Sequence, residues 1–379
     1  MVGAGPRGAN TSFRTSKDSK ILSYEVNILN DIILDVRNMS THFPVAEGTI
    51  KAVNQLSFTL SKNETLGIVG ETGSGKSVSM KSVMGMIKSP GYITKESQIL
   101  FKTNEFSKDG KEEFVDLAKL KQKDFTRIRG KHIGMVFQDP MSSLNPMFTI
   151  ADQMIETIVF HQNVSIEEAR ERAIKLLDDV GIANPAERID DYPFQLSGGQ
   201  RQRVVIAIGL SCNPEILIAD EPTTALDVTI QAQILELMKD LQQEYNMGMI
   251  YITHDLSVIA EVADKVIVMY GGTQMEMADI YTLFEKPMHP YTHALLSCIP
   301  RHDIKVDLLN PIKGQPPVML DPPPLCPFLP RCPYATEKCR KEWPELKEVE
   351  ENHYLRCFNP LSDSTPLHYD DVIDKKEAL

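Results

Sequence analysis

Three glycines, a lysine and a hydroxyl residue stand at a defined spacing in one short segment, Gly70-Glu71-Thr72-Gly73-Ser74-Gly75-Lys76-Ser77. Glycines let the backbone curl until its N–H groups point at phosphate oxygens, and a helix N-terminus adds positive potential there. In this pattern the lysine reaches the terminal phosphates, and the last hydroxyl can bind Mg²⁺. The segment follows the apolar residues 66–69 and opens a helix-compatible stretch. We therefore expect a nucleotide site here rather than a plain glycine-rich turn.

Two consecutive carboxylates, Asp220 and Glu221, follow the apolar segment 216–219. Ligands of α/β proteins bind at the carboxyl ends of strands. Asp220 is placed to hold the Mg²⁺ shell, and Glu221 could polarise an attacking water. A solvated turn is the alternative, which the accompanying phosphate loop disfavours. The two elements together predict a phosphate-loop ATPase or GTPase.

Brief apolar runs alternate with helix-like segments along the body of the chain. The runs are residues 65–69, 133–137, 216–219, 249–253 and 266–269. They predict buried strands of a largely parallel sheet. Between them, Ser165 and Glu168 predict a capping box at the start of an amphipathic helix. The alternation predicts an α/β core with crossover connections.

The composition argues against two classes of protein. The 40 Lys and Arg residues against 52 Asp and Glu give a formal charge of −12, which disfavours a protein that coats nucleic acid. No stretch approaches the roughly 18 consecutive apolar residues of a membrane-spanning helix. A chain of 379 residues is long enough for one large α/β unit with an appended module.

The segment Leu196-Ser197-Gly198-Gly199-Gln200 lies just upstream of the acidic strand and resembles the signature motif of the ATP-binding cassette (ABC) ATPases. Gln138 resembles the Q-loop of that family, Ala225-Leu226-Asp227 its D-loop, and His254 its switch histidine. The resemblance covers roughly residues 32–300. It implies a phosphate-loop (RecA-like) α/β core with an antiparallel β subdomain and an inserted α-helical signature subdomain.

The resemblance also implies how these residues act on ATP and Mg²⁺. Gln138 would join Ser77 and Asp220 around the metal ion. The catalytic group would consist of Glu221, His254 and Gln138. The residues expected to contact the nucleotide are Phe43, Gly70, Glu71, Thr72, Gly73, Ser74, Gly75, Lys76, Ser77, Gln138, Ser197, Gly199, Gln200, Asp220, Asp227 and His254.

Two of these assignments need comment. Ser197 and Gly199 stand at a predicted helix N-terminus, which suits a γ-phosphate. In the family that phosphate belongs to a nucleotide on the opposite subunit, so a second ATPase chain is implied. Phe43 would stack on adenine, as an aromatic does in the family, and a place in the hydrophobic core is its alternative role.

Three further segments resemble the oligopeptide and dipeptide permease branch, near its D-type subunit. They are the extended Q-loop from Gln138 to Pro146, the segment Tyr192-Pro193-Phe194-Gln195, and His289-Pro290-Tyr291-Thr292. The resemblance implies a peripheral ATPase at the cytoplasmic face of the cell membrane that powers peptide import. Its implied partners are a homologous ATPase in a heterodimer, two transmembrane permease subunits and, indirectly, an extracytoplasmic solute-binding protein. The Q-loop and the helical segment 148–180 would contact the membrane subunits.

Other functions stay open from the sequence. The imported solute could be nickel or another compound, because the binding protein and membrane subunits select it. A soluble ABC ATPase of translation or DNA maintenance typically carries two cassettes or a coiled-coil insertion, and we detect neither here. A non-hydrolysing regulatory subunit is disfavoured by Glu221.

Four of the six cysteines, Cys326, Cys332, Cys339 and Cys357, cluster in a proline-rich C-terminal region. Their intervals contain no C-x2-C knuckle of structural zinc and no compact ferredoxin run. Such a module could hardly bury enough core to fold alone, so we expect a metal centre to hold it together. The segment resembles the cysteine-rich C-terminal extension of the peptide-permease subunits, and on that ground a [4Fe–4S] cluster is favoured. Zinc bound by the same cysteines, or free thiols, are the alternatives.

The expected organisation runs as follows. A disordered tail covers residues 1–30, and the ABC nucleotide-binding domain covers 31–300, with its helical subdomain at about 139–212. A proline-rich linker at 301–325 leads to the cysteine-rich extension at 326–358. Residues 359–379 form a second tail.

Overall fold

The computed structural model describes residues 31–224, 226–298 and 312–362. The chain divides into two compact units, Met1–Ile32 and Ile33–Leu379, and the second contains the elements discussed below. The predicted tail 1–30, the end of the chain from residue 363, and residues 299–311 lie outside the described residues. Among the helices of the described ranges, none is long and apolar enough to cross a membrane.

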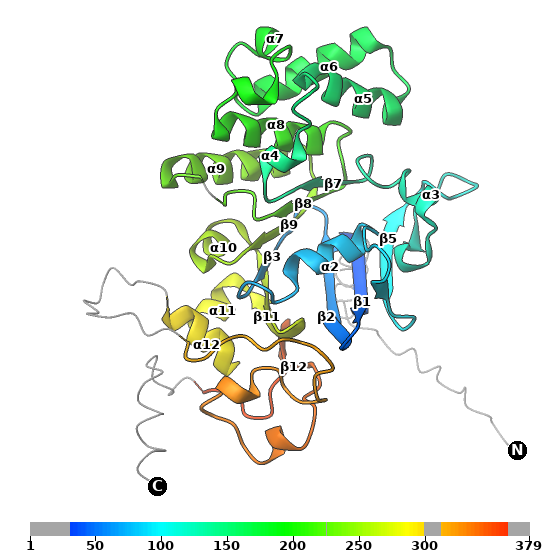
Figure 1. Cartoon of the computed structure of the whole chain (residues 1–379). Helices are drawn as coiled ribbons and strands as arrows, with labels where there is room; N and C mark the ends of the chain where they lie inside the picture. Colours follow the sequence, from blue (N-terminus) through cyan, green and yellow to red (C-terminus); the bar gives the residue numbers. More distant parts are fainter. Residues whose placement is uncertain (1–30, 225, 299–311, 363–379) are drawn as a thin grey trace, which may run out of the picture. The chain divides into compact units, whose positions relative to one another are not determined.

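Five strands form the parallel centre of the sheet, in the order β10, β3, β9, β8, β7 (Figure 1). Their bounds are β3 (Thr65–Val69), β7 (Ile133–Val136), β8 (Ile216–Asp220), β9 (Gly248–Thr253) and β10 (Lys265–Tyr270). All five coincide with the predicted apolar runs to within one residue at each end. Because such runs carry no polar alternation, both faces of this part of the sheet are covered.

Further strands, most of them paired antiparallel, extend the sheet beyond β10. They are β11 (Thr273–Asp279), β2 (Gly48–Ser61), β1 (Ile32–Val45), β5 (Gln98–Thr103), β6 (Glu113–Asp116) and the short β4 (Tyr92–Ile93). Strand β11 pairs antiparallel with β10 and meets β2 in parallel at Thr273 and Asn54. The C-terminal extension adds β12 (Lys347–Glu350) and β13 (His353–Leu355), and β13 pairs with β11. The extension is therefore continuous with the main sheet.

Helices flank the sheet and fill the segment between β7 and β8 (Figure 1). Those of the inserted segment are α4 (Pro140–Ser143), α5 (Ile150–Gln162), α6 (Ile166–Asp179), α7 (Pro185–Arg188) and α8 (Gly198–Leu210). The others are α2 (Lys76–Val83), α3 (Gln122–Phe125), α9 (Val228–Glu244), α10 (Leu256–Val262), α11 (Ile280–Glu285) and α12 (Pro290–Ser297). The Ser165 side chain caps α6 by accepting a hydrogen bond from the Glu168 N–H, which is one half of the predicted capping box.

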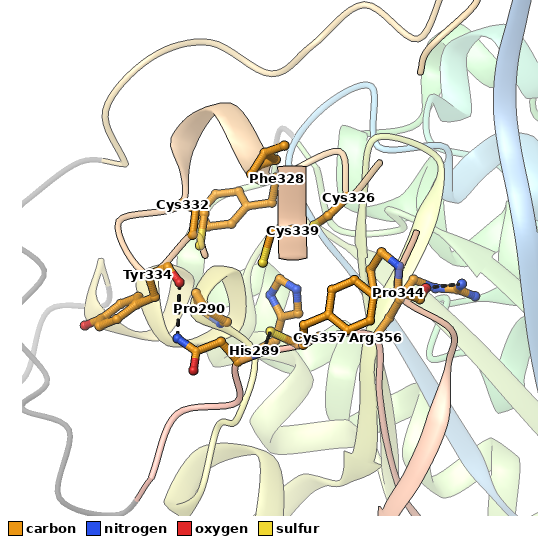
Figure 2. Close-up of a pocket in the computed structure, with 14 residues that line it drawn as sticks. His289, Pro290, Cys326, Phe328, Cys332, Tyr334, Cys339, Pro344, Arg356 and Cys357 are labelled. Carbon is orange, nitrogen blue, oxygen red and sulfur yellow. Dashed lines mark hydrogen bonds between the residues drawn. The ribbon is translucent and has the colours of Figure 1, made fainter. Parts of the chain in front are cut away.

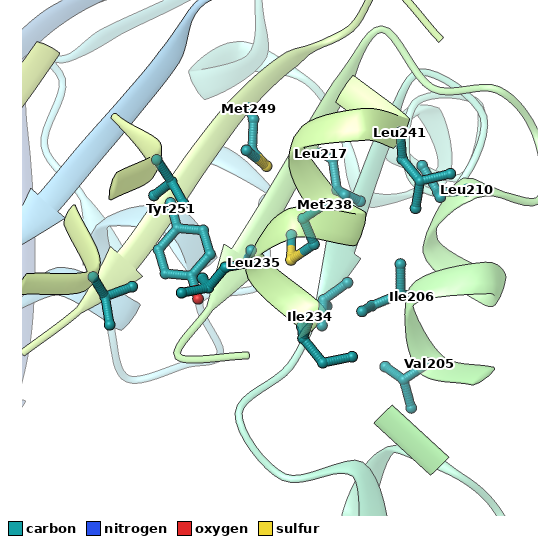
Figure 3. Packing of buried hydrophobic residues seen from close by; sticks show 14 of the residues in the cluster. Val205, Ile206, Leu210, Leu217, Ile234, Leu235, Met238, Leu241, Met249 and Tyr251 are labelled. Carbon is teal, nitrogen blue, oxygen red and sulfur yellow. The ribbon is translucent and has the colours of Figure 1, made fainter. Parts of the chain in front are cut away.

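Two hydrophobic clusters cover the two faces of the sheet. Strand β8 shows the alternation: Leu217 and Ala219 belong to one cluster, Ile216 and Ile218 to the other. Figure 3 shows α8 and α9 packed on the face of the sheet that carries Leu217. The labelled side chains there are Val205, Ile206, Leu210, Leu217, Ile234, Leu235, Met238, Leu241, Met249 and Tyr251. Each fully buried aliphatic side chain contributes about 1.5–3 kcal/mol, so this packing fixes the strand ends that carry the site.

Candidate nucleotide site

The phosphate loop runs from the end of β3 to the first residue of α2, which is Lys76. Gly75 has a φ of 95°, and a Cβ there would lie 2.3 Å from the carbonyl oxygen of Ala52. The loop therefore needs glycine at this position for both conformation and space. The Lys76 ammonium group donates to the backbone oxygens of Gly70 at 2.7 Å and Glu71 at 3.2 Å. Burial lowers its pKa, although Glu221 and Asp220 oppose that shift.

One buried polar atom in the loop fits a phosphate ligand. The Ser74 side chain is 3% exposed, and its hydroxyl has no hydrogen-bond partner among the described residues. A buried hydroxyl without a partner is costly, and a phosphate oxygen would accept its hydrogen bond. The residues predicted from the glycine pattern thus form a cradle with an unused donor.

The predicted Mg²⁺ ligands Ser77 and Asp220 meet directly. The Ser77 hydroxyl donates to the Asp220 carboxylate at 2.8 Å, although 143 residues separate them in the chain. Asp220 is 3% exposed, and burial raises the pKa of its carboxyl group. Hydroxyl and carboxylate oxygens are the ligands that Mg²⁺ prefers, so this pair has the right donor chemistry for the ion.

Glu221 is the point on which the other predicted catalytic residues converge. Its Oε2 accepts hydrogen bonds from the Gln138 amide and from the Thr224 hydroxyl, each at 3.0 Å. The His254 Nδ1 lies 3.3 Å from the same oxygen. Glu221 also has a φ of 48°, in the left-handed region that non-glycine residues seldom adopt. Such strain is typical of functional sites.

An open pocket contains the predicted residues Thr72 to Ser77, Gln138, Glu221 and His254. Its remaining wall includes residues that the sequence analysis did not select. Thr224 stands three residues after Glu221 but belongs to no motif that we used. Residues 316–319 line the pocket too, although they fall inside the segment predicted as a linker.

The signature residues lie elsewhere. Ser197 is the N-cap of α8 and forms a capping box with Gln200, in which each side chain accepts from the other's backbone N–H. Asp227 caps α9 by accepting from the Ile230 N–H at 2.9 Å. None of these residues, nor Gly199, lines the pocket of their own phosphate loop. Their contact with a nucleotide stays a prediction that needs a second chain.

Phe43 is not among the residues that line the pocket. Its ring faces Gly91, where an added Cβ would come within 2.4 Å of it. The predicted stacking of Phe43 on adenine stays a prediction.

The four clustered cysteines line one common pocket, together with His289 and Arg356 (Figure 2). In the part of the chain that the structure describes, none of the four forms a disulfide. Burial, reinforced by the neighbouring thiols, raises the pKa of Cys326 and of Cys357 to about 12. Within the described residues, no set of three or more His, Cys, Asp or Glu side chains has the arrangement of a metal site. The convergence of the thiols is thus present without metal-ligand geometry.

Comparisons with known proteins show the family of the chain. The family model for ABC transporters matches residues 53–224, and that for the C-terminal region of oligopeptide/dipeptide transporters matches residues 275–339. The oligopeptide transport ATP-binding protein AppD of Bacillus subtilis (strain 168) is 48% identical over 86% of this chain and 96% of its own length. The dipeptide transport ATP-binding protein DppD of Escherichia coli (strain K12) is 45% identical over 88% of this chain and 98% of its own.

Solved structures support the same assignment. The ATP-binding cassette MJ0796, in a dimeric structure of a post-hydrolysis state bound to ADP and Pi, superposes with a TM-score of 0.56. It is 28% identical and covers 65% of this chain and 99% of its own. The fold of this chain is therefore that of a known ATP-binding cassette. The chain is a member of the ABC transporter ATPase family.

Proposed function

We propose that this chain is the ATP-hydrolysing subunit of an importer for oligopeptides or dipeptides. The observation that carries the proposal is the convergence of Gln138, Thr224 and His254 on the Glu221 carboxylate, next to the Ser77–Asp220 pair. Relatives whose names describe oligopeptide and dipeptide transport match this chain over nearly their whole length. Nickel or another solute is the alternative cargo.

The chemistry follows from the placement of charges. Lys76 and the loop N–H groups neutralise the β- and γ-phosphates. Ser77, Asp220 and Gln138 would hold Mg²⁺, and the ion when bound would supply positive charge to the phosphate oxygens. Glu221 accepts a proton from the water that attacks the γ-phosphorus, and the bond to the β-phosphate oxygen breaks. His254 contacts the γ-phosphate and keeps the Glu221 carboxylate in place, giving ADP and phosphate as products.

The position of the signature residues supports a two-chain site. Ser197, Gly199 and Gln200 lie outside the pocket of their own phosphate loop. They present a helix N-terminus that suits the γ-phosphate of a nucleotide on a second subunit. We infer a dimer with a homologous ATPase, in which two chains close on two ATP molecules.

The surface of α5 and its neighbours supports contact with the membrane subunits. A groove there is lined by Phe148, Phe160 and Ile166, which are 51%, 69% and 64% exposed. Exposed apolar side chains around a groove are typical of a protein interface. The proposed occupant is a coupling helix of a transmembrane permease subunit, which places this chain at the cytoplasmic face of the membrane.

The pocket of four thiols supports a metal centre in the extension. Four cysteines that line one pocket are the ligand set of a [4Fe–4S] cluster, and zinc takes the same ligands, although the described thiols do not have the arrangement of a metal site. We propose the cluster. Anaerobic purification followed by iron, sulfide and zinc analysis tests it, and one zinc per chain without sulfide would contradict it.

The transport function is tested by purifying the tagged chain from membranes and identifying the copurifying proteins. The proposal predicts two membrane permease subunits and a second ABC ATPase. Copurification with ribosomes or DNA, and without permease subunits, would instead support a soluble ABC ATPase.

A further inference from the structure

The cysteine-rich extension contacts the phosphate loop through one arginine. Arg331 stands directly before Cys332, and its Nη1 donates to both carboxylate oxygens of Glu71, at 3.1 and 2.9 Å. The same nitrogen donates to the Tyr270 hydroxyl at 3.0 Å. The Arg331 side chain is only 7% exposed. The Glu71 side chain is 22% exposed, so this is a partly buried ion pair between residues 260 positions apart in the chain.

The rest of the guanidinium group is held by the segment that precedes the extension. Its Nε donates to the Lys313 carbonyl and its Nη2 to the Ile312 carbonyl, both at 2.9 Å. A planar group held on several sides has one orientation, so the direction of Arg331 toward Glu71 is set before any nucleotide binds.

Glu71 is in turn held through all three of its polar groups. Its backbone N–H donates to the Tyr291 hydroxyl at 3.0 Å, and its carbonyl accepts from the Lys76 ammonium group at 3.2 Å. The carboxylate is the group that Arg331 holds. Glu71 lies immediately before Thr72, the first loop residue in the pocket lining. A change at the Glu71 carboxylate would therefore be transmitted to the backbone that receives the phosphates.

The segment that precedes the extension reaches the same pocket independently. Residues 316–319 form part of its wall. They are anchored beside β2, because the Met319 carbonyl accepts from the Lys51 N–H at 2.9 Å and the Asp321 N–H donates to the Thr49 carbonyl at 2.9 Å. The region after residue 311 is thus part of the nucleotide site's surroundings at two separate points.

We propose that Arg331 is a positioning residue for ATP binding: it neutralises Glu71 and holds the phosphate loop in its binding shape, so that the extension sets the affinity for MgATP. The loop must receive several negative charges of a triphosphate. An unpaired carboxylate beside it would repel them and would lose its own fixed position. The inference rests on the ATPase function proposed above, but not on the presence of a cluster.

The test uses the purified complex with the partner ATPase site silenced. Arg331→Met removes the charge but keeps the length of the side chain, and we expect the KM for MgATP to rise on the order of tenfold. The kcat should stay within about twofold, because Glu221 and the Ser77–Asp220 pair are untouched. Arg331→Lys keeps the charge without the planar fork and should recover part of the affinity. Arg340→Met, at an exposed position of the same extension, is the matched control and should leave the KM unchanged.

A double variant separates positioning from damage to the extension. If the unpaired carboxylate causes the defect, Arg331→Met combined with Glu71→Gln should return the KM to that of Glu71→Gln alone. A double variant whose KM for MgATP stays as high as that of Arg331→Met would overturn the proposal. A KM for Arg331→Met equal to that of the native chain would also overturn it. Nucleotide affinity is measured in parallel with a fluorescent ATP analogue. If the native complex binds ATP but does not hydrolyse it, the proposed ATPase function is contradicted. The role of Arg331 is then still tested by comparing the affinities of the native complex and Arg331→Met for the fluorescent analogue.

Discussion

Replacing the Glu221 carboxylate by an amide separates ATP binding from hydrolysis. In Glu221→Gln the side-chain oxygen can still accept the hydrogen bonds that Gln138 and Thr224 now donate at 3.0 Å. The geometry of the pocket is therefore kept. The amide has no basicity, however, and cannot take a proton from the attacking water.

The size of the effect follows from the step that is lost. A positioned general base contributes about 10²- to 10⁴-fold to a rate, which corresponds to about 3–5 kcal/mol in the activation barrier. The Ser77–Asp220 pair and Lys76 are unaffected, so the Kd for MgATP should change by less than about threefold.

The assay is phosphate release by the purified complex, with the partner's catalytic site silenced in all samples. Glu221→Asp is the matched control, because it keeps a carboxylate but withdraws it from the water. It should retain more activity than Glu221→Gln. A Glu221→Gln complex that hydrolyses ATP within about fivefold of the native rate would refute the role of Glu221 as the base.

Three further predictions concern packing, acid stability and the metal site. Met238→Ala removes a fully buried side chain of α9 from the cluster that also contains residues of α8 and β9. The change should lower the free energy of unfolding by about 2–5 kcal/mol in urea titration, and a loss below about 1 kcal/mol would contradict the packing described. Burial alone would raise the pKa of Glu105, but hydrogen bonds from Lys131, His132 and Arg127 lower it to about 2. The ionised Glu105 carboxylate therefore stabilises the fold fully above its ordinary pKa of 4.5, and this contribution is lost as the pH falls toward 2. The difference in free energy of unfolding between the native chain and Glu105→Gln should shrink between pH 5 and pH 3. A difference that stays constant over this range would contradict the prediction. Ser77→Ala should raise the Mg²⁺ concentration needed for half-maximal ATPase activity, and an unchanged requirement would remove Ser77 from the metal shell.

The motifs that were predictable from the sequence are local ones. The phosphate loop occupies eight consecutive residues, so its glycines and Lys76 could be assigned together, and the strands that carry it were continuous apolar runs. The cysteines could be grouped because they are close in sequence, and the structure places them around one pocket.

Contacts between distant segments were not predictable in this way. The pairing of Arg331 with Glu71 spans 260 residues, and no periodicity links the two positions. The proline content of residues 301–325 argued against helices, since prolines lack the N–H that a helix needs, and the described part of that segment, residues 312–325, contains none. It could not indicate that residues 316–319 would pack against β2 and line the pocket. The left-handed backbone of Glu221 depends on its surroundings and likewise has no sequence signal.

Peptide uptake by the reconstituted complex tests the central claim most directly. The four-subunit complex is placed in lipid vesicles with the ATPase face outward. The solute-binding protein and a labelled short peptide are enclosed in the lumen of the vesicles. We predict that MgATP added outside drives release of the peptide from the lumen, and that Glu221→Gln abolishes this movement while MgATP still binds. Peptide movement at the native rate in the variant, with the partner's site silenced, would contradict the account.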